Sequence, residues 1–398
     1  MTTPAGHAAA CAYKNKPLWS NNPHDSIIQK TQNEKKLALY GDWSKKSVTV
    51  DNKTQPKILQ FTQFEDHLGV ADDRDNITVY DWKSDRILSR FSNGNPFGTK
   101  ITDLKYINED DVSIMMTASS DGIIKLYKNY HSPEDVENVA SWRGLTDMLL
   151  TPRSFGLITE WQQSRGSLLA TGDVNVIRLW DVHTETVEVD IPAKTSALIT
   201  SLTSDQLAGD IFVGGFSDGT LRVYDRRLDH RNAIVRRWGT AGTGRDVWIN
   251  NVHLQRGGYR ELVSGTTNGC VQLWDIRSEE PIRTFYDEST GSTNTQRGNL
   301  TMTSAQVHEH APVIATSTKE IKIWTTSGDL LTAFKNPTGG NGMASTIAGA
   351  TGIRSNRTSS SSFVSSMSFH PHRMMLVAAN SHDTRFNIFK CTGRNVYA

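Results

Sequence analysis

The chain is poor in cysteine and has no long apolar run. Its 398 residues contain 3 cysteines, Cys11, Cys270 and Cys391, too few and too scattered for a disulfide framework or a zinc cluster. We therefore expect free thiols in a reducing cytoplasm. No stretch approaches the roughly 20 apolar residues of a membrane-spanning helix. Residues 1–6 lack the basic and apolar regions of a signal peptide, so we expect a cytoplasmic protein without direct membrane insertion.

The chain also lacks an excess of charge of either sign. Its 43 basic and 42 acidic residues leave a formal net charge of +1. A protein attracts polyanions through an excess of positive charge. The balance here therefore predicts no general affinity for nucleic acid or for anionic membranes.

Motifs of catalysis and cofactor binding are missing as well. The sequence has no Gly-x-Ser-x-Gly elbow, and no carboxylate pair stands apart from the turn aspartates. The glycine-rich stretch 239–245 looks like a phosphate-binding loop, but the alternating stretch 247–249 follows it in place of a helix. We interpret it as a turn between strands. The sequence thus predicts no enzyme, no catalytic residues and no cofactor.

Two histidine pairs, His308 with His310 and His370 with His372, have the spacing that places both side chains on one face of a strand. Such a pair can begin a metal site. No cysteine or third ligand lies nearby, and a proline in or beside each pair marks a turn. We therefore predict that these histidines bind no metal.

What the sequence does contain is a repeat, in which a short alternating strand ends in an aromatic residue, often followed by Asp. The spacing of these aromatics runs from 44 residues (180 to 224) to 65 residues (324 to 389). They are Tyr80, Tyr127, Trp180, Tyr224, Trp274, Trp324 and Phe389. A period of about 40–50 residues with one aromatic-Asp end per repeat is typical of WD-repeat propellers. The predicted fold is an all-β, seven-bladed WD-repeat β-propeller.

Turn residues and small residues precede several of these strands. Asp121-Gly122, Asp218-Gly219 and Asn268-Gly269 supply the positive φ of tight hairpins. Pairs of small residues stand before the turns at 118–119, 214–215, 264–265 and 378–379. We expect them in the crowded strand beside the central channel, where larger side chains would clash.

The repeat divides the chain into a lead and a propeller. Residues 1–45 do not fit it, and we interpret them as a flexible N-terminal lead before a propeller over 46–398. A strand near 47–51 is predicted to complete the last blade, while the first blade uses 58–61, 68–71, 77–80 and 87–91. The stretch 336–362 is rich in Gly and Ser and has no acidic residue. It is predicted to be a disordered inter-blade loop, either a tolerated insertion, which we favour, or a phosphorylated segment.

An arginine-rich run, 226–238, is the main charged feature of the sequence. Arg226, Arg227, Arg231, Arg236 and Arg237 lie in a predicted connection that leaves blade four, and Trp238 follows them. Arg and Trp are enriched in interface hot spots, so these six residues are candidates for protein contacts. The alternative is a solvated loop whose arginines pair with nearby aspartates.

Trp142 is the seventh interaction candidate. It belongs to an apolar stretch, 142–148, in the gap between blades two and three. This stretch either covers the propeller core or docks a partner, and its composition favours the first alternative.

Several longer segments are more specific than a generic WD repeat. They span 91–96, 141–148, 215–227, 307–315, 321–324 and 368–372. On these residues the chain resembles, from about 40 to 391, the C-terminal WD-repeat propeller of the Raptor family, the scaffold subunits of target-of-rapamycin (TOR) kinase complexes. The stretches 239–245 and 336–362 depart from the family pattern.

The resemblance implies a non-catalytic scaffold in nutrient and growth signalling. Its partners would be subunits of the TOR kinase complex, and through them it would reach the vacuolar or lysosomal surface. Raptor-family proteins also carry a caspase-like region and a helical solenoid before the propeller, and this chain would correspond to the propeller alone. Substrates are recruited mainly through those upstream regions, so we do not expect this chain to recruit them by itself.

Two other functions remain open from the residues. A different WD-repeat role would be a ubiquitin-ligase substrate receptor or a histone-tail reader. An enzyme that uses the central channel is a third alternative, although no convergent set of catalytic residues supports it.

Overall fold

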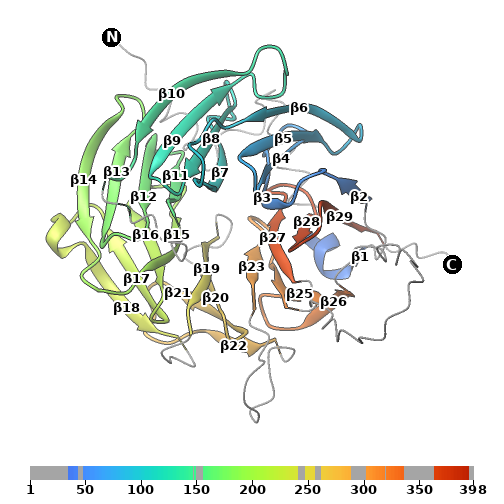
Figure 1. Ribbon diagram of the computed structural model, residues 1–398. Helices are drawn as coiled ribbons and strands as arrows, with labels where there is room; N and C mark the ends of the chain where they lie inside the picture. Colours follow the sequence, from blue (N-terminus) through green and yellow to red (C-terminus); the bar gives the residue numbers. More distant parts are fainter. Residues whose placement is uncertain are drawn as a thin grey trace, which may run out of the picture.

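The computed structural model describes residues 35–43, 48–146, 148, 156–240, 247–255, 261–287, 302–318, 320–335 and 363–393. Within these ranges seven antiparallel sheets are arranged in a ring (Figure 1). This arrangement confirms the predicted all-β, seven-bladed propeller. No helix in the described part of the chain has the length and apolarity to span a bilayer. The expected loop 336–362 lies outside the described residues, as does Cys11.

Blades one to six are four-stranded meanders whose first strand lines the central channel. Blade one consists of β3 (Pro56–Phe61), β4 (His67–Asp72), β5 (Asn76–Asp81) and β6 (Arg86–Ser92). Blade two consists of β7 (Ile101–Ile107), β8 (Ile114–Ser119), β9 (Ile123–Lys128) and β10 (Glu137–Arg143). Blade three consists of β11 (Ile158–Gln162), β12 (Ser167–Thr171), β13 (Val176–Asp181) and β14 (Thr186–Pro192).

The remaining blades follow the same plan. Blade four consists of β15 (Ile199–Ser204), β16 (Ile211–Phe216), β17 (Thr220–Asp225) and β18 (Ile234–Gly239). Blade five consists of β19 (Ile249–Leu254), β20 (Glu261–Thr266), β21 (Cys270–Asp275) and β22 (Arg283–Tyr286). Blade six consists of β23 (Ser304–Val307), β24 (Val313–Ser317), β25 (Glu320–Thr325) and β26 (Leu330–Lys335).

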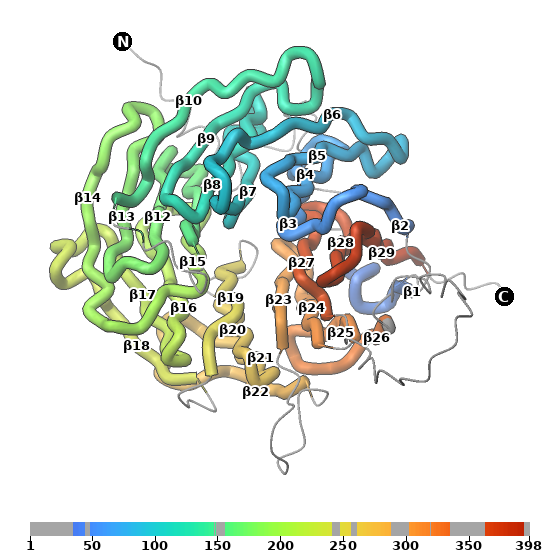
Figure 2. The backbone as a smooth tube through the Cα atoms, viewed as in Figure 1, coloured from blue at the N-terminus to red at the C-terminus, as the bar shows by residue number. Residues whose placement is uncertain are grey.

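Blade seven combines the two ends of the chain. Its strands β27 (Val364–Phe369), β28 (Met375–Asn380) and β29 (Arg385–Thr392) come from the C-terminal part. The strands β1 (Asp42–Trp43) and β2 (Val48–Asp51) both pair with β29. Figure 2 shows the tube returning to its start, with β2 beside β29. The pairing confirms the predicted closing strand near 47–51.

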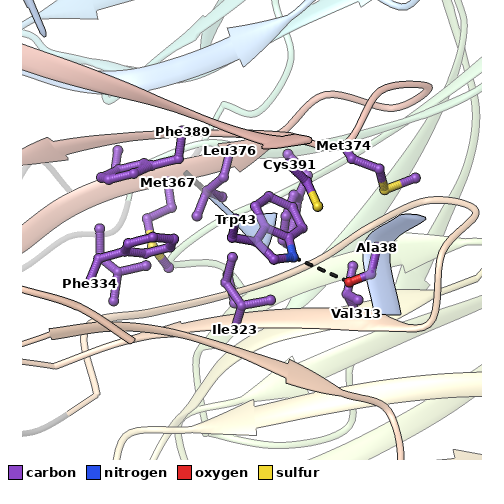
Figure 3. Close-up of a cluster of buried hydrophobic side chains, with 14 of the residues drawn as sticks. Ala38, Trp43, Val313, Ile323, Phe334, Met367, Met374, Leu376, Phe389 and Cys391 are labelled. Atoms are coloured by element: carbon purple, nitrogen blue, oxygen red, sulfur yellow. Dashed lines mark hydrogen bonds between the residues drawn. The ribbon is translucent and has the colours of Figure 1, made fainter. Parts of the chain in front are cut away.

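The N-terminal segment contributes to the core before that strand. Residues 35–40 form a helical turn, inside the stretch that was expected to be a flexible lead. The Trp43 indole Nε1 donates to the Ala38 carbonyl at 3.3 Å, and both residues are buried with Met367 and Phe389 (Figure 3). Burial of the Trp43 ring in this core stabilises the position of the N-terminal segment. The ordered structure therefore includes residues 35–43, whereas 1–34 lie outside the described residues.

The hydrophobic core is divided into clusters that lie between neighbouring blades. One cluster, for example, joins Leu169 of β12 to Ile199 of β15 and Phe212 of β16. Among the described residues, each of the seven junctions between blades has such a cluster. A single blade cannot cover both of its faces, so its stability depends on its two neighbours.

The small residues before the turns were predicted to lie in the strand beside the central channel. They lie instead in second strands, such as β16 and β20. A Cβ added to Gly215 would lie 2.5 Å from the Ile249 Cγ2 of β19, and one added to Gly265 would lie 2.7 Å from the Ala305 Cβ of β23. The crowding that requires these glycines therefore comes from the inner strand of the next blade.

Candidate interaction surface

The arginine-rich run forms part of blade four itself. It begins at the end of β17, continues through the short 3-10 helix η1 (His230–Asn232) and ends in the outer strand β18. The Asp225 N–H donates to the Ala233 carbonyl at 2.8 Å and closes the turn, and the Asp229 carboxylate caps η1. The run is thus a turn and a paired strand inside blade four, and not the connection leaving blade four that the sequence predicted. We call residues 226–232 the arginine turn.

Arg227 is held by the aspartate that ends β17. Its guanidinium donates to the Asp225 carboxylate through Nε at 2.9 Å and Nη2 at 2.6 Å. This pairing lowers the pKa of the Asp225 carboxyl. The Arg227 side chain is still 63% exposed, and Arg277 forms the same two-point pair with Asp275 in blade five. Two adjacent blades therefore present fixed, exposed guanidinium groups at the same end of the third strand.

Two other arginines of the run form hydrogen bonds to neighbouring blades. The Arg226 side chain is only 5% exposed, and it reaches blade three through Glu188 at 2.5 Å and Gln162 at 2.8 Å. The half-buried Arg236 donates from Nη1 to the Ser278 carbonyl of blade five at 3.2 Å. Both guanidinium groups therefore connect blades, and they offer little surface to a partner.

Trp238 belongs to the core of the junction between blades four and five. It is 5% exposed, and its indole stacks on that of Trp274 with 5.0 Å between ring centroids. Its Nε1 donates to the Ser278 carbonyl at 3.1 Å, the same acceptor that Arg236 uses. The aromatic residue that suggested a hot spot is thus a packing residue.

The structure brings the exposed residues of the arginine turn together and separates Arg237 from them. Arg227, Leu228 and Arg231 are exposed in the turn. Arg237 is exposed further along β18, with its guanidinium 4.0 Å from the Asp218 carboxylate. Leu228 was not singled out in the sequence, because exposure of one leucine in a turn has no sequence signature. In the corresponding segment of blade five Ile282 is also exposed.

Trp142 lies in the outer strand of blade two. Its half-buried ring meets Trp180 of blade three at 6.2 Å between centroids, and the Trp180 Nε1 donates to the Gly144 carbonyl at 3.1 Å. Leu145 is buried in the same cluster. This position matches the core-covering alternative for the stretch.

The central channel has a volume of about 480 Å³ and is lined by the inner strands of all seven blades. Among the described residues that line the channel the one lysine is Lys105 of β7, which lies 3.8 Å from the Asp103 carboxylate and 3.6 Å from the Glu160 carboxylate. Burial opposes the charge of Lys105, but the two carboxylates outweigh it and raise its pKa. Glu160 also accepts hydrogen bonds from Ser204 and Gln206. These groups are engaged in joining blades, and a permanently charged lysine is a poor nucleophile or base.

The histidine pairs lie in the turns that connect first and second strands, where a ring nitrogen accepts backbone hydrogen bonds. The His308 Nδ1 accepts from the backbone N–H of His310 at 3.2 Å and of Ala311 at 3.1 Å, and its Nε2 lies 3.1 Å from the Arg373 carbonyl. Burial lowers the pKa of His308 to about 4, so the ring is neutral. The His370 Nδ1 caps the next such turn through the His372 N–H. The described residues contain no group of three potential metal ligands.

Comparison with known proteins finds relatives across almost the whole chain. A β-propeller family model described as "Nucleolar protein 10-like, N-terminal domain" matches residues 154–362. The chain is 63% identical over 386 residues to the target of rapamycin complex 1 subunit KOG1 of Saccharomyces cerevisiae, covering 96% of this chain and 25% of that protein. It matches the crystal structure of Chaetomium thermophilum Raptor at 39% identity with a TM-score of 0.77, covering 92% of this chain and 31% of that one.

A more distant structure shows how little identity the fold requires. The propeller of Myceliophthora thermophila Cps50 (Swd1) has 15% identity and a TM-score of 0.64, and it covers 87% of this chain. That likeness concerns the fold alone. The chain spans less than a third of the length of the KOG1 and Raptor chains that it matches.

Proposed function

Because this chain belongs to the β-propeller family whose model matches residues 154–362, and is a Raptor-type propeller by its similarity to KOG1 and Raptor, we propose that it is a scaffold of the TOR kinase complex. One observation carries the proposal. The propeller fold is kept at 15% identity, so 63% identity over 386 residues far exceeds what folding demands. The similarity to KOG1 therefore extends over almost the whole chain and goes beyond what unrelated propellers share.

The proposed mechanism is binding without catalysis. In the described part of the channel, the side chains of Lys105, Asp103 and Glu160 pair with each other and with neighbouring strands. A rigid ring presents its turns in fixed positions, which lowers the entropy lost on binding. The partners are subunits of the TOR kinase complex, and neither nucleic acid nor membrane insertion is part of the function. The protein acts in the cytoplasm and reaches the vacuolar or lysosomal surface through its partners, in nutrient and growth signalling.

The arginine turn is the contact surface that we assign to this function. Arg227 and Arg231 supply exposed positive charge, and Leu228 supplies apolar area between them. Arg226, Arg236 and Trp238 join blade four, which carries this surface, to blades three and five. Trp142 packs at the more distant junction of blades two and three. A partner with acidic residues around an apolar contact would fit the turn.

Affinity purification of the tagged chain from fungal cells, followed by mass spectrometry, tests the proposal. Recovery of the TOR kinase is expected for the unaltered chain. The double variant R227E/R231E should recover at least tenfold less kinase, whereas R86E, an exposed arginine at the start of β6 on blade one, should recover as much as the unaltered chain. Recovery of cullin adaptors or histones in place of the kinase would favour the ubiquitin-ligase or histone-tail alternative. Equal recovery by both variants would remove the arginine turn from the proposal.

A further inference from the structure

In three blades the side chain at the end of the inner strand bonds to the next blade, at the turn between that blade's first and second strands. In blade three the Gln162 Nε2 donates to the Gly209 carbonyl of blade four at 3.2 Å. In blade five the Gln255 Nε2 donates to the His308 carbonyl of blade six at 3.5 Å. In blade six His308 itself forms the bond, because its Nε2 lies 3.1 Å from the Arg373 carbonyl of blade seven. Two of these bridges are therefore amides, and one is an imidazole.

An imidazole in this position can take up a proton, which an amide does not do at moderate pH. The His308 Nδ1 accepts from the N–H groups of His310 and Ala311, so the single hydrogen of the neutral ring is on Nε2. A second proton would have to bind at Nδ1, between these two N–H groups, and would break both hydrogen bonds. It would also place a charge on a ring that is fully buried. The bridge from blade six to blade seven therefore requires a neutral His308.

The other junction of blade seven depends on a second neutral histidine. His370 follows the inner strand β27 as His308 follows β23, and its Nδ1 accepts from the His372 N–H at 3.1 Å. Its buried ring packs against blade one, with its centroid 5.2 Å from that of Phe61 and 5.8 Å from that of Trp82. Burial lowers the pKa of His370 well below its ordinary value. Blade seven thus has a buried neutral imidazole at each of its two junctions.

The charged and titratable groups around these two histidines and their ring neighbours come from blades five, six, seven and one. They are His253, Glu309, His310, His372, Arg373, Lys390, Lys83 and Asp66. Two of them are carboxylates: Glu309 lies 3.3 Å from the His253 Nε2, and Asp66 bonds to Arg373 at 3.1 Å. The three lysine and arginine side chains already outnumber these carboxylates at neutral pH. Each proton that an imidazole takes up adds to this positive charge and opposes the contacts of blade seven.

Blade seven is also the blade at which the ring closes, and its outer edge is completed by two short strands. β1 pairs with β29 over 2 residues and β2 over 4. The outer strands of blades one to four, in contrast, are continuous over 6 or 7 residues. Local opening begins where few hydrogen bonds and buried contacts must be lost. The closing blade is therefore the part of the ring that we expect to open first.

We propose that blade seven is an acid-sensitive closure of the ring, which separates from blades six and one when His308 and His370 take up protons while blades two to five stay folded. Separation exposes both rings to water, where a histidine has a pKa of about 6.5. The pKa of His308 in the closed ring is about 4, so the open form binds the proton first as the pH falls. For His308 alone, the equilibrium constant for opening should rise about 50-fold between pH 7 and pH 4.5.

Hydrogen exchange of the full chain, measured by mass spectrometry at pH 7 and pH 4.5 and corrected for the intrinsic exchange rates, tests this inference. The amides of β28 and β29 should lose at least tenfold in protection at pH 4.5. Those of β12 and β13 in blade three, whose described residues include no buried histidine, should change less than threefold. An equal loss of protection in both blades would indicate global unfolding and overturn the proposal. Unchanged protection of blade seven would overturn it as well.

Replacement of the two histidines gives the second arm. Gln162 and Gln255 show that an amide can form the bridge to the next blade, so H308Q should fold and should retain at least fivefold more protection in β28 and β29 at pH 4.5 than the unaltered chain. H308Q/H370Q should retain more. V139A, at an exposed position of the outer strand β10, is the control and should lose protection as the unaltered chain does. An equal loss in H308Q and V139A would contradict the role of His308, and the comparison between blades of the unaltered chain tests the proposal independently of how stable the variants are.

Discussion

Val48 lies directly opposite Ile388 in the sheet of blade seven, so strands from the two ends of the described chain close the ring. The neighbouring helical turn and β1 add Ala38 and Trp43 to the core between blades six and seven. The pairing of β2 with β29 and the burial of Trp43 therefore both contribute to ring closure. Variants that remove one of these contacts therefore measure how much ring closure contributes to the stability of the propeller.

Replacing Trp43 by alanine should destabilise the chain by about 3–5 kcal/mol, the cost of removing a large buried aromatic ring. Chemical denaturation followed by tryptophan fluorescence or circular dichroism measures this change. Tyr40, in the same segment but exposed, is the matched control, and Y40A should change the free energy of unfolding by less than about 0.5 kcal/mol. A small effect of W43A would show that the N-terminal segment contributes little to closure.

The distinction between packing and surface residues in the arginine-rich run predicts opposite stability effects. W238A removes a buried indole that stacks on Trp274 and donates to the Ser278 carbonyl, so it should cost about 3–5 kcal/mol. R231A alters an exposed side chain and should stay within about 0.5 kcal/mol. Equal effects in urea unfolding would contradict the assignment of Trp238 to the core.

The buried His308 predicts a loss of stability at acid pH. Burial lowers its folded-state pKa to about 4, whereas an unfolded histidine has a pKa of about 6.5. Its stabilising contribution is complete above pH ~6.5 and is lost as pH falls toward the folded pKa, because the unfolded state binds the proton first. The shift corresponds to roughly 3 kcal/mol.

His370 is also buried with a lowered pKa, so it adds to the same trend. The free energy of unfolding, measured by urea titration from pH 7 to pH 4.5, should therefore fall less steeply in H308Q than in the unaltered chain. V139A, at an exposed position of β10, removes no titratable group and should retain the original pH profile. An H308Q profile parallel to that of the unaltered chain would contradict the account of His308.

A methyl group added at Gly215 should destabilise the folded chain by crowding the next blade. A Cβ at this position would lie 2.5 Å from the Ile249 Cγ2. G215A should therefore cost about 1–3 kcal/mol through overpacking. At Gly393, where the nearest such atom is 4.0 Å away, alanine should have little effect. Thermal unfolding of the two variants compares them directly, and equal melting temperatures would show that the blades can separate to accept the methyl group.

Much of the fold was predictable from local patterns. The four predicted strands of blade one, at 58–61, 68–71, 77–80 and 87–91, fall within β3 to β6. The alternation of apolar residues and the Asp-Gly turns act over a few residues, so they are visible in the sequence. The closing strand near 47–51 was also predictable, because the last repeat lacked one strand. The contribution of Ala38 and Trp43 was not, because a short apolar segment carries no sign of the distant pocket that it fills.

The candidate contact residues divide in a way that the sequence did not show. Arg226 and Arg227 are adjacent, yet one is buried against Glu188 and Gln162 and the other is exposed beside Asp225. The enrichment of Arg and Trp at interfaces also applies to buried junctions between blades, where the same residues form hydrogen bonds and stacks.

The sequence by itself determined the number of blades, the order of their strands and the absence of an excess charge, since these follow from repeats and composition. Only the tertiary structure decided which side chains the ring turns inward and which it leaves at its surface. The reason is that exposure depends on the neighbouring blade, which lies tens of residues away along the chain. A guanidinium or an aromatic ring that the neighbouring blade covers joins the two blades. One that is left uncovered can contact a partner.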